Sequence, residues 1–356
     1  GECSYLTSQM GAGVVRGYQS KGVAACVKHF AGYSASEGGR DYNTTWIPEV
    51  QLRDIYLPPF KAALDAGAMS IMCSFNDLNG LPSSANHHLN VDILRNEWQS
   101  DALLVSDWGS GSDLVPHGLA KDKKDAALRC INARMEMDMQ GNIYTDYLKE
   151  LLADGKIKES QIDEGVRSIL RMKYKLGLFE NPYVEEDKPM KYSPEDIAVI
   201  DQMVEESAVL LKNDGILPLE IFGKTPTLLI CGPMADQKKE QLGTWVFDGK
   251  PEYSVTPLMA FREIAEQGSV NLLYEPGLPF SRSRDAEGIK KAVTQARKAD
   301  VILYFCGEEA ILSGEARCRA NLNLPGAQCE MMEALAATGK PVIMIVMAGR
   351  PLTIGA

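Results

Sequence analysis

The chain has 356 residues, 45% of them hydrophobic and 24% charged, and a formal net charge of -11. At roughly 150 residues per domain, this length and apolar content predict about two folded domains and exclude a disordered chain. The acidic charge, without clusters of Lys and Arg, argues against nucleic acid or an anionic membrane as the main partner. No apolar run approaches the ~20 residues of a membrane-spanning helix.

Short apolar runs and helical patterns alternate through the first half of the chain. The predicted strands are residues 23–30, 68–75, 102–106 and, more weakly, 135–139. The predicted helices are residues 51–66, 91–99, 123–133, 144–153 and 161–176. Continuous apolar runs are typical of parallel strands that are buried on both faces. Four such units are too few for a complete eightfold barrel, which leaves a small open sheet or the second half of a barrel as alternatives.

A polar, proline-rich segment at residues 180–194 separates this part from a second series of elements. We predict a connecting helix over 196–212, strands at 227–231, 270–274, 301–306 and 342–346, and helices at 286–298 and 328–337. The predicted organisation is therefore a first domain over 1–180, a linker with a connecting helix over 181–224, and a second domain over 225–356.

The eight cysteines indicate neither a zinc site nor a redox motif, because no CxxC pair occurs. Cys26, Cys73, Cys231 and Cys306 lie in apolar, strand-like runs, where cysteine behaves as a small hydrophobic residue. A single disulfide between Cys318 and Cys329 stays open as an alternative. Because HExxH, GxSxG and GxGxxG motifs are also absent, the sequence predicts no metal and no cofactor.

The clearest candidate for a reactive group is Asp107, which follows an apolar predicted strand and precedes Trp108 and Gly109. In parallel α/β domains the reactive groups lie at the carboxyl ends of strands. A carboxylate in that place can act as a nucleophile, and Trp108 offers a flat apolar face on which a sugar ring can stack. The alternative is structural: Asp107 caps the next helix or stabilises the turn.

Three other stretches follow predicted strands. Lys28 and His29 supply hydrogen-bond donors for a polyol or an anion, and they precede a long, glycine-rich loop at 31–42. A Lys that reaches the surface beside a hydrogen-bonded His explains them more simply. Met72 is explained by core packing. Glu315 lies in a loop, where it can be a general acid whose pKa is set by its neighbours. It can equally be a solvated surface charge, and the spacing of the residues alone favours this second interpretation.

Seven stretches of the sequence together carry a family resemblance. They are KHFAGYSASEGGRDYN (28–43), IMCSFNDLNG (71–80), LLVSDWGS (103–110), KYKLGLFENPY (173–183), SAVLLKNDGILPL (207–219), SGEARCRANLNLPG (313–326) and PVIMIVMAGRPL (341–352). In this order they resemble glycoside hydrolase family three, the β-glucosidase and β-xylosidase family, over essentially the whole chain. The resemblance implies the C-terminal half of a TIM-like (β/α)8 barrel followed by the N-terminal part of an α/β sandwich domain, in a chain truncated at both ends.

The resemblance also implies an activity and the residues that carry it. The implied enzyme is a retaining exo-acting β-glycosidase of the β-glucosidase type, with Asp107 as the nucleophile and Glu315 as the general acid/base. The chemistry agrees, since retention needs one ionised and one protonated carboxyl group roughly 5–5.5 Å apart. Lys28 and His29 are implied to hold hydroxyls of the sugar, and Met72 and Trp108 to form walls of its subsite.

The sequence departs from the family pattern in several places. One branch of the family takes its acid/base from a barrel loop that contains His, and the equivalent loop here, 32–41, has none, which favours Glu315. Phe75 stands where many members carry a Tyr, so a hydroxyl that could help to orient the nucleophile is missing. The early barrel strands, with an Asp and an Arg of the sugar subsite, are not in the chain.

Among such enzymes the chain resembles the bacterial periplasmic β-glucosidases, and this resemblance implies a periplasmic or secreted location. The expected partner is a small oligosaccharide or an aryl or alkyl β-glycoside, and no prediction of the oligomeric state follows. Two alternatives stay open: a β-xylosidase or other exo-β-glycosidase of the family, and a fragment without catalytic competence, since half a barrel exposes sheet edges. A sugar-binding module is disfavoured because both Asp107 and Glu315 are present.

Overall fold

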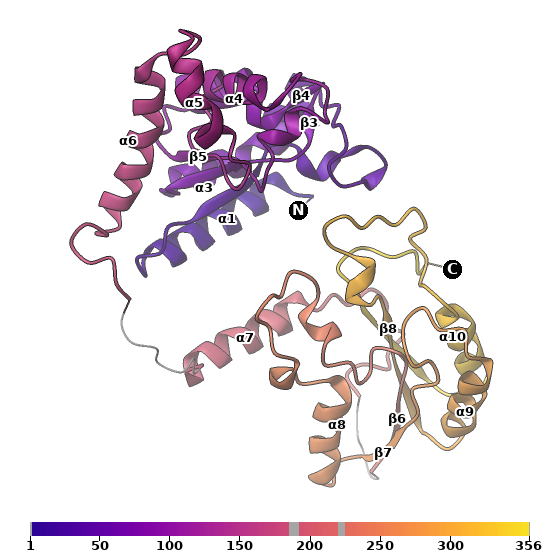
Figure 1. The fold of residues 1–356 in the computed structure, drawn as a ribbon. Coiled ribbons are helices and arrows are strands. Elements are labelled where there is room, and N and C mark those ends of the chain that lie inside the picture. Colours follow the sequence, from indigo (N-terminus) through magenta and orange to yellow (C-terminus); the bar gives the residue numbers. More distant parts are fainter. Residues whose placement is uncertain (1, 185–191, 220–224, 356) are drawn as a thin grey trace. The chain divides into compact units, whose positions relative to one another are not determined.

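The computed structural model describes residues 2–184, 192–219 and 225–355, which fall into two compact units, Gly1–Glu186 and Asp187–Ala356 (Figure 1). Both units are α/β structures with parallel sheets, and the predicted fold class is confirmed. Residues 185–191 and 220–224 of the predicted linker lie outside the described residues.

The first unit contains a parallel sheet in the order β1-β2-β5. Its strands are β1 (Cys26–Phe30), β2 (Ser70–Cys73) and β5 (Leu103–Val105). In the register of this sheet, Cys26 pairs with Ser70, and Ser70 pairs with Leu103. The three predicted strands are thus confirmed with shorter bounds, and their carboxyl ends lie at one edge.

Helices and turns surround this sheet. The helices are α1 (Ser4–Gln19), α2 (Glu49–Gln51), α3 (Leu57–Asp65), α4 (Lys123–Asn132), α5 (Ile143–Ala153) and α6 (Glu159–Lys175), with π-helical segments at Leu52–Tyr56 and His88–Glu97. Short 3₁₀ turns lie at Tyr33–Ala35, Glu37–Gly39, Ser83–Ala85 and Ser112–Leu114, and a small hairpin joins β3 (Asp77–Leu78) to β4 (Leu81–Pro82). The predicted helices are confirmed, whereas α1 and the hairpin are additional elements.

The core of the first unit forms where the strands meet these helices. Phe30, Ile71 and Leu104 of the three strands are fully buried, as are Leu94 of the π-helical segment and Ala127 of α4. Helix α4 begins where the Asp122 side chain accepts the Asp125 N–H, and its buried side chains recur with helical spacing. Burial of each large aliphatic side chain contributes about 1.5–3 kcal/mol, so the core holds the strand ends rigidly.

The weak strand predicted at 135–139 does not form. Only an isolated parallel bridge joins Val105 to Met137. Side chains take the place of two backbone partners: the Leu104 N–H donates to Oε2 of Glu136 at 3.0 Å, and the Met139 N–H donates to Oγ of Ser106 at 2.7 Å. The segment therefore follows β5 without completing a regular ladder.

The second unit contains a parallel sheet in the order β7-β6-β8-β9. Its strands are β6 (Thr227–Cys231), β7 (Asn271–Tyr274), β8 (Val301–Gly307) and β9 (Val342–Met347), which confirms the four predicted strands. Its helices are α7 (Pro194–Ser207), α8 (Pro257–Glu266), α9 (Ala286–Ala296) and α10 (Gln328–Ala336), and 3₁₀ turns lie at Glu240–Leu242, Pro251–Tyr253 and Ala310–Leu312.

The connecting helix is shorter than predicted. It ends at Ser207, and Ala208 already has extended angles of φ -72° and ψ 123°. The prediction of 196–212 was too long because the sequence has no Gly or Pro before Gly215 to mark a helix end. Beyond the helix, Oδ1 of Asn213 accepts the N–H groups of Gly215 and Leu217, which stabilises a turn instead.

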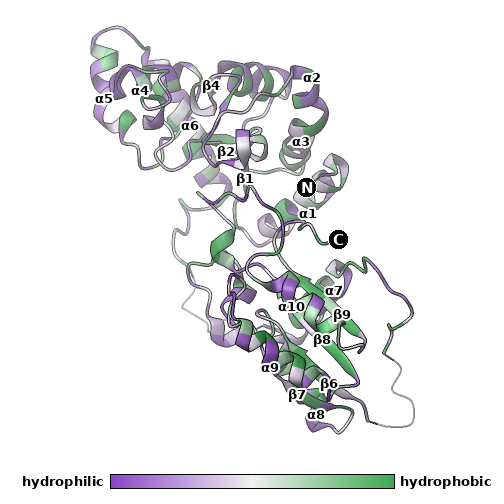
Figure 2. Ribbon diagram, turned by 90° about the vertical axis from the view of Figure 1, so that its right-hand side faces the viewer, coloured by the Kyte–Doolittle hydropathy of each residue, from purple (hydrophilic) through white to green (hydrophobic). Residues whose placement is uncertain are grey.

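Helices cover both faces of the second sheet, which is a sandwich of three layers (Figure 1). On one face, Leu229, Ile302 and Tyr304 pack with side chains of α9 and α10. On the other face, Ile230 and Leu303 pack with Leu258 of α8 and its neighbours. The two central strands, β6 and β8, are accordingly hydrophobic along their length, as Figure 2 shows. This double burial is the pattern that continuous apolar runs predict.

All eight cysteines have free thiols, so Cys318 and Cys329 are not joined in this structure. Cys73, Cys231 and Cys306 are buried as predicted. Cys26 is exposed, because it lies in β1, an edge strand of its sheet. Among the helices in the described parts of the chain, none has the length and apolar character to cross a membrane.

Candidate active site

The carboxyl edge of the first sheet brings together five of the six residues that the sequence singles out. Lys28 and His29 lie in β1, Met72 lies in β2, and Asp107 and Trp108 follow β5. The pairing of Met72 with Val105 places the end of β2 beside the start of this turn. Lys28 is exposed and Met72 is half-buried.

Asp107 is buried, and a different group lies beside each of its carboxylate oxygens. Oδ1 accepts the backbone N–H of Trp108 at 2.7 Å. Oδ2 lies 3.2 Å from Nε2 of His29, whose side chain is one-quarter exposed. The carboxylate is therefore held in one orientation at the sheet edge, beside a polar ring that solutes can reach. A carboxylate fixed in this way is suited to attack an electrophilic carbon or to stabilise a cation.

The backbone around Asp107 is held by the segment that follows α4. The Ser106 N–H donates to Met137 O at 2.9 Å, and the Gly109 N–H donates to Met139 O at 2.8 Å. Gly109 has a φ of +72°, a conformation that favours glycine. These bonds fix the turn on both sides of Asp107.

A buried ion pair lies beneath this turn. Oε2 of Glu136 accepts from Nη2 of Arg95 at 2.9 Å, and Oε1 of Glu136 accepts from Ser168 Oγ at 3.0 Å. Burial raises the pKa of Glu136 even though Arg95 favours its ionised form. Through these contacts Glu136 links Arg95 of the π-helical segment His88–Glu97 to Ser168 of α6. The same carboxylate also accepts the N–H of Leu104 in β5, the strand that leads to Asp107.

Aromatic side chains cluster around His29. The Tyr33 ring lies edge-on at 5.1 Å from the His29 ring, and Phe75 lies 5.1 Å from Tyr42 and 6.1 Å from Tyr33, as centroid distances. Trp108 is 63% exposed beside Asp107, so its ring is available for a ligand. Tyr33 and Tyr42 were not predicted as site residues, because their loop has no periodicity; their only signal is that two tyrosines follow the Lys-His pair.

Glu315 belongs to the second unit, where it lies in a turn of the loop after β8. The Arg317 N–H donates to Gly314 O at 3.2 Å, and Ala316 has a left-handed φ of +57°. Gly314 has a φ of +97°, and a Cβ there would lie 2.9 Å from Oγ1 of Thr244. The turn thus rests closely on the segment around Thr244, with the Glu315 side chain half-buried.

Beside Glu315 is an open cavity of about 530 Å³, which Trp245, Phe247 and Ile311 also line. The Trp245 and Phe247 rings are 5.1 Å apart, and they are 62% and 84% exposed. Neither residue was predicted from the sequence, where the available signal was two aromatic residues in a polar, glycine-containing stretch. This cavity offers a carboxyl group next to an aromatic surface.

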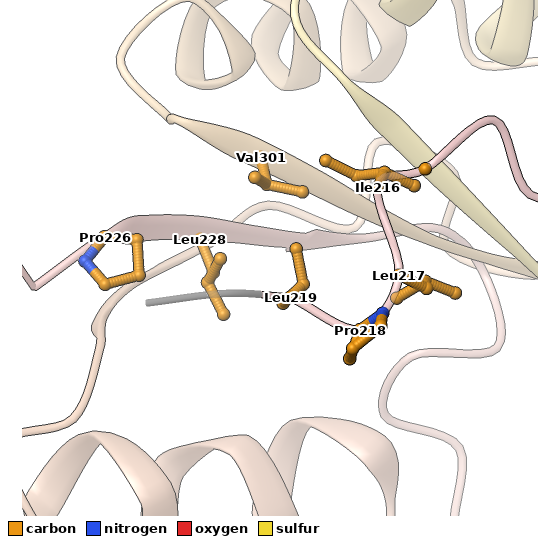
Figure 3. A pocket seen from close by; sticks show the side chains of 8 residues that line it. Ile216, Leu217, Pro218, Leu219, Pro226, Leu228 and Val301 are labelled. Carbon is orange, nitrogen blue, oxygen red and sulfur yellow. The ribbon is translucent and has the colours of Figure 1, made fainter. Parts of the chain in front are cut away.

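A second cavity in the same unit, of about 480 Å³, has a different character (Figure 3). The residues described in its lining carry no polar side chain: Gly215, Ile216, Leu217, Pro218, Leu219, Pro226, Leu228 and Val301. With no ionisable group in that lining, it is not a candidate for acid–base chemistry. Across the described ranges, no three His, Cys, Asp or Glu side chains are grouped so that they could hold a metal ion.

Comparison with known proteins gives consistent matches along the whole chain. The model of the glycosyl hydrolase family 3 N-terminal domain matches residues 1–172, and that of the C-terminal domain of the same family matches residues 208–356. A periplasmic beta-glucosidase of Salmonella typhimurium is 35% identical over 99% of this chain and 50% of its own length. A beta-xylosidase of Formosa agariphila is 33% identical over 99% of the chain and 52% of its own length.

Solved structures of proteins named beta-glucosidase also match this chain. A beta-glucosidase from Listeria innocua, in complex with isofagomine, is 32% identical with a TM-score of 0.92 over 99% of this chain and 50% of that one. The chain therefore spans about half the length of the relatives that it matches.

Proposed function

The chain belongs to glycosyl hydrolase family 3, and from this premise we propose that the protein is a retaining, exo-acting β-glucosidase. Its substrates are small oligosaccharides and aryl or alkyl β-glycosides, from which it releases terminal, non-reducing β-D-glucosyl residues. The observation that carries the proposal is the fixed carboxylate of Asp107, 3.2 Å from His29 at the carboxyl edge of a parallel sheet. Because the Salmonella typhimurium relative is named periplasmic, a location outside the cytoplasm is part of the proposal.

The proposed reaction is a double displacement. In the first step an oxygen of Asp107 attacks the anomeric carbon, and Glu315 gives its proton to the departing glycosidic oxygen. In the second step Glu315 takes a proton from water, the water oxygen attacks the same carbon, and Asp107 leaves as a carboxylate. Two inversions give net retention of the β configuration.

The surroundings of each carboxyl group support these roles. The Trp108 N–H and His29 hold Asp107 in one orientation, which removes the cost of aligning the nucleophile during the reaction. The proposal assigns Lys28 and His29 to donate hydrogen bonds to sugar hydroxyls, and Met72 and Trp108 to form apolar walls. Beside Glu315, Trp245 and Phe247 offer a surface on which the leaving group can lie.

A mechanism-based inactivator tests the nucleophile. The enzyme is incubated with 2,4-dinitrophenyl 2-deoxy-2-fluoro-β-glucoside, and the modified peptide is identified by mass spectrometry. We expect the label on Asp107 and no label in an Asp107→Asn variant, with Asp113→Asn, six residues further along, labelled as the unchanged protein is. A label on any other residue contradicts the assignment.

The family includes enzymes for other sugars, and a relative named beta-xylosidase is 33% identical to this chain. The choice is made by comparing kcat/KM for 4-nitrophenyl β-glucoside and 4-nitrophenyl β-xyloside. The proposal expects the glucoside to be preferred, whereas a preference for the xyloside identifies a β-xylosidase. The same assay on the 356-residue chain by itself tests the alternative that this chain alone is inactive.

A further inference from the structure

Glu308, the first residue after β8, is a buried carboxylate that the reaction as proposed does not use. Its side chain is only 2% exposed. Its backbone N–H donates to Met347 O of β9 at 3.0 Å, so its main chain continues the ladder of the sheet. A carboxylate this deeply buried requires partner charges, because its desolvation is otherwise prohibitive.

Two arginines supply these charges, Arg319 from the loop after β8 and Arg350 from the segment after β9. Arg319 contacts Oε1 of Glu308 through Nη1, and Nε of Arg350 lies 3.1 Å from Oε2. Arg319 also donates from Nη2 to Asn321 O at 2.8 Å and to Asn323 O at 2.9 Å. Arg350 donates from Nη2 to Leu312 O at 2.8 Å.

These contacts hold one loop on both sides of Glu315, and we call these two sides its limbs. We call residues 308–327, which connect β8 to α10, the Glu315 loop. Leu312 lies three residues before Glu315 and Arg319 lies four residues after it, and both are tied to the same carboxylate, one directly and one through Arg350. The ends of the loop are held separately, by the buried Gln328, whose Nε2 donates to Gly307 O and to Pro325 O.

We propose that Glu308 is a positioning residue for Glu315: its carboxylate, held between Arg319 and Arg350, fixes the two limbs of the Glu315 loop and so the place of the acid/base. The inference rests on the proposed function. Gln328 fixes the ends of the loop and the Gly314–Thr244 contact supports its tip, whereas Glu308 sets the path between them. Loss of the Glu308 charge removes the group that links the two arginines, and the two limbs of the loop can then shift relative to each other while the sheet stays intact.

The dependence of the rate on the leaving group separates this role from a general loss of stability. Expulsion of 2,4-dinitrophenolate needs no proton, whereas expulsion of methoxide needs the proton of Glu315. In the intact enzyme, Glu308→Gln is expected to lower kcat/KM for methyl β-glucoside by about 10- to 100-fold, the cost of a displacement of roughly 1 Å, and to leave 2,4-dinitrophenyl β-glucoside within about threefold. Partial unfolding lowers both values equally, because it only removes active molecules.

Two further variants serve as the negative and the positive control. Glu287→Gln, which removes an exposed carboxylate from α9 of the same unit, is expected to change neither rate. Glu315→Gln is expected to show the same selective loss as Glu308→Gln, but a larger one. If Glu315→Gln lacks the selective loss, the proposed role of Glu315 is wrong and the inference falls with it. If Glu315→Gln shows it and Glu308→Gln lowers both substrates equally or neither, the positioning role alone is overturned.

Arg350→Gln provides an independent test of the proposal if Glu308→Gln does not fold. Arg350→Gln removes the bond to Leu312 O and one partner of Glu308, but it leaves the contact of Glu308 with Arg319. It is expected to lower the methyl β-glucoside rate selectively, and restoration of that rate by Arg350→Lys would locate the effect in the charge. An Arg350→Gln enzyme whose two rates stay in the original ratio contradicts the proposal.

Discussion

Nε2 of His29 lies 3.2 Å from Oδ2 of Asp107, although the two residues come from strands that are not neighbours. Strand β2 lies between β1 and β5, and adjacent strands are about 4.8 Å apart. The gap is closed because both residues lie at the carboxyl edge of the sheet, where the turn after β5 allows Asp107 to turn toward β1. This contact makes His29 the side chain on which the orientation of Asp107 most directly depends.

Replacement of His29 by Ala is therefore expected to lower kcat/KM for 4-nitrophenyl β-glucoside by about 10- to 150-fold, the range for loss of a polar contact to a charged group. His29→Gln, which retains a donor, is expected to lose less. His88→Ala is the matched control, since His88 is a half-exposed histidine of the same unit whose partners are Glu49 and Asp92. Equal rates for His29→Ala and His88→Ala would show that the contact has no part in turnover.

Trp108 provides a second prediction, on binding rather than on orientation. Its side chain is 63% exposed, so Trp108→Ala should change the free energy of unfolding by no more than about 0.5 kcal/mol. Loss of an aromatic face is worth about 0.5–1.5 kcal/mol, which corresponds to an increase in KM of about twofold to tenfold at similar kcat. Steady-state kinetics beside Trp46→Ala, another exposed tryptophan of this unit, measure the effect. A fall in kcat at constant KM would contradict a binding role.

Strand positions could be predicted because buried parallel strands leave a strong local signal. The apolar run before Asp107 and the Asp-Trp-Gly turn after it placed the carboxylate at a strand end, where the structure has it. The position of Lys28 and His29 near a strand end followed from the same reasoning about β1, although the pattern alone favoured a structural role for them. What no local pattern contains is the sheet order, and therefore the sequence alone could not show that His29 contacts Asp107.

Other elements could not be predicted from local sequence patterns, because tertiary contacts decide whether they form. Helix α1 contains three glycines, each of which lowers helix propensity by about 1 kcal/mol relative to Ala. It forms nonetheless, since Ala12 and Val15 are buried and the helix packs against α3. The strand predicted at 135–139 failed for the opposite reason: side chains of Ser106 and Glu136 occupy the backbone groups that a ladder would use.

The buried pair of Arg95 and Glu136 gives a third prediction. The two side chains are 6% and 4% exposed, and burial lowers the pKa of Arg95 and raises that of Glu136, so both charges are disfavoured there. Removing one partner, as in Arg95→Met, should destabilise the protein by about 3–5 kcal/mol because it leaves the other charge buried alone. The double variant Arg95→Met/Glu136→Leu should lose much less than the sum of the two single losses.

Urea unfolding followed by a probe in the first unit measures these free energies. The control is the pair of Arg53 and Glu97, whose side chains are 39% and 48% exposed. There the single substitutions should cost at most about 1 kcal/mol, because exposed ion pairs contribute little. Additive losses at Arg95 and Glu136 would mean that the two residues act independently.

The fourth prediction concerns pH and the residue next to Glu308. Burial alone would raise the pKa of Glu309, but Arg282 and Ser281 donate hydrogen bonds to its carboxylate, and the net pKa lies below the ordinary value of 4.5. A carboxyl group with a lowered pKa in the folded state stabilises the protein fully above its unfolded pKa, and this contribution is lost as the pH falls through the folded value.

Glu309→Gln should therefore be less stable than the unchanged protein near neutral pH, by about 1.5–3 kcal/mol if both hydrogen bonds to the charge are lost. The difference should shrink as the pH falls below about 4 and the carboxyl group of the unchanged protein takes up a proton. Chemical unfolding across this range measures it, with Glu287→Gln as the exposed control that shows no such trend. A difference that grows toward acid pH would mean that the pKa of Glu309 is raised on folding, and that burial outweighs its contacts with Arg282 and Ser281.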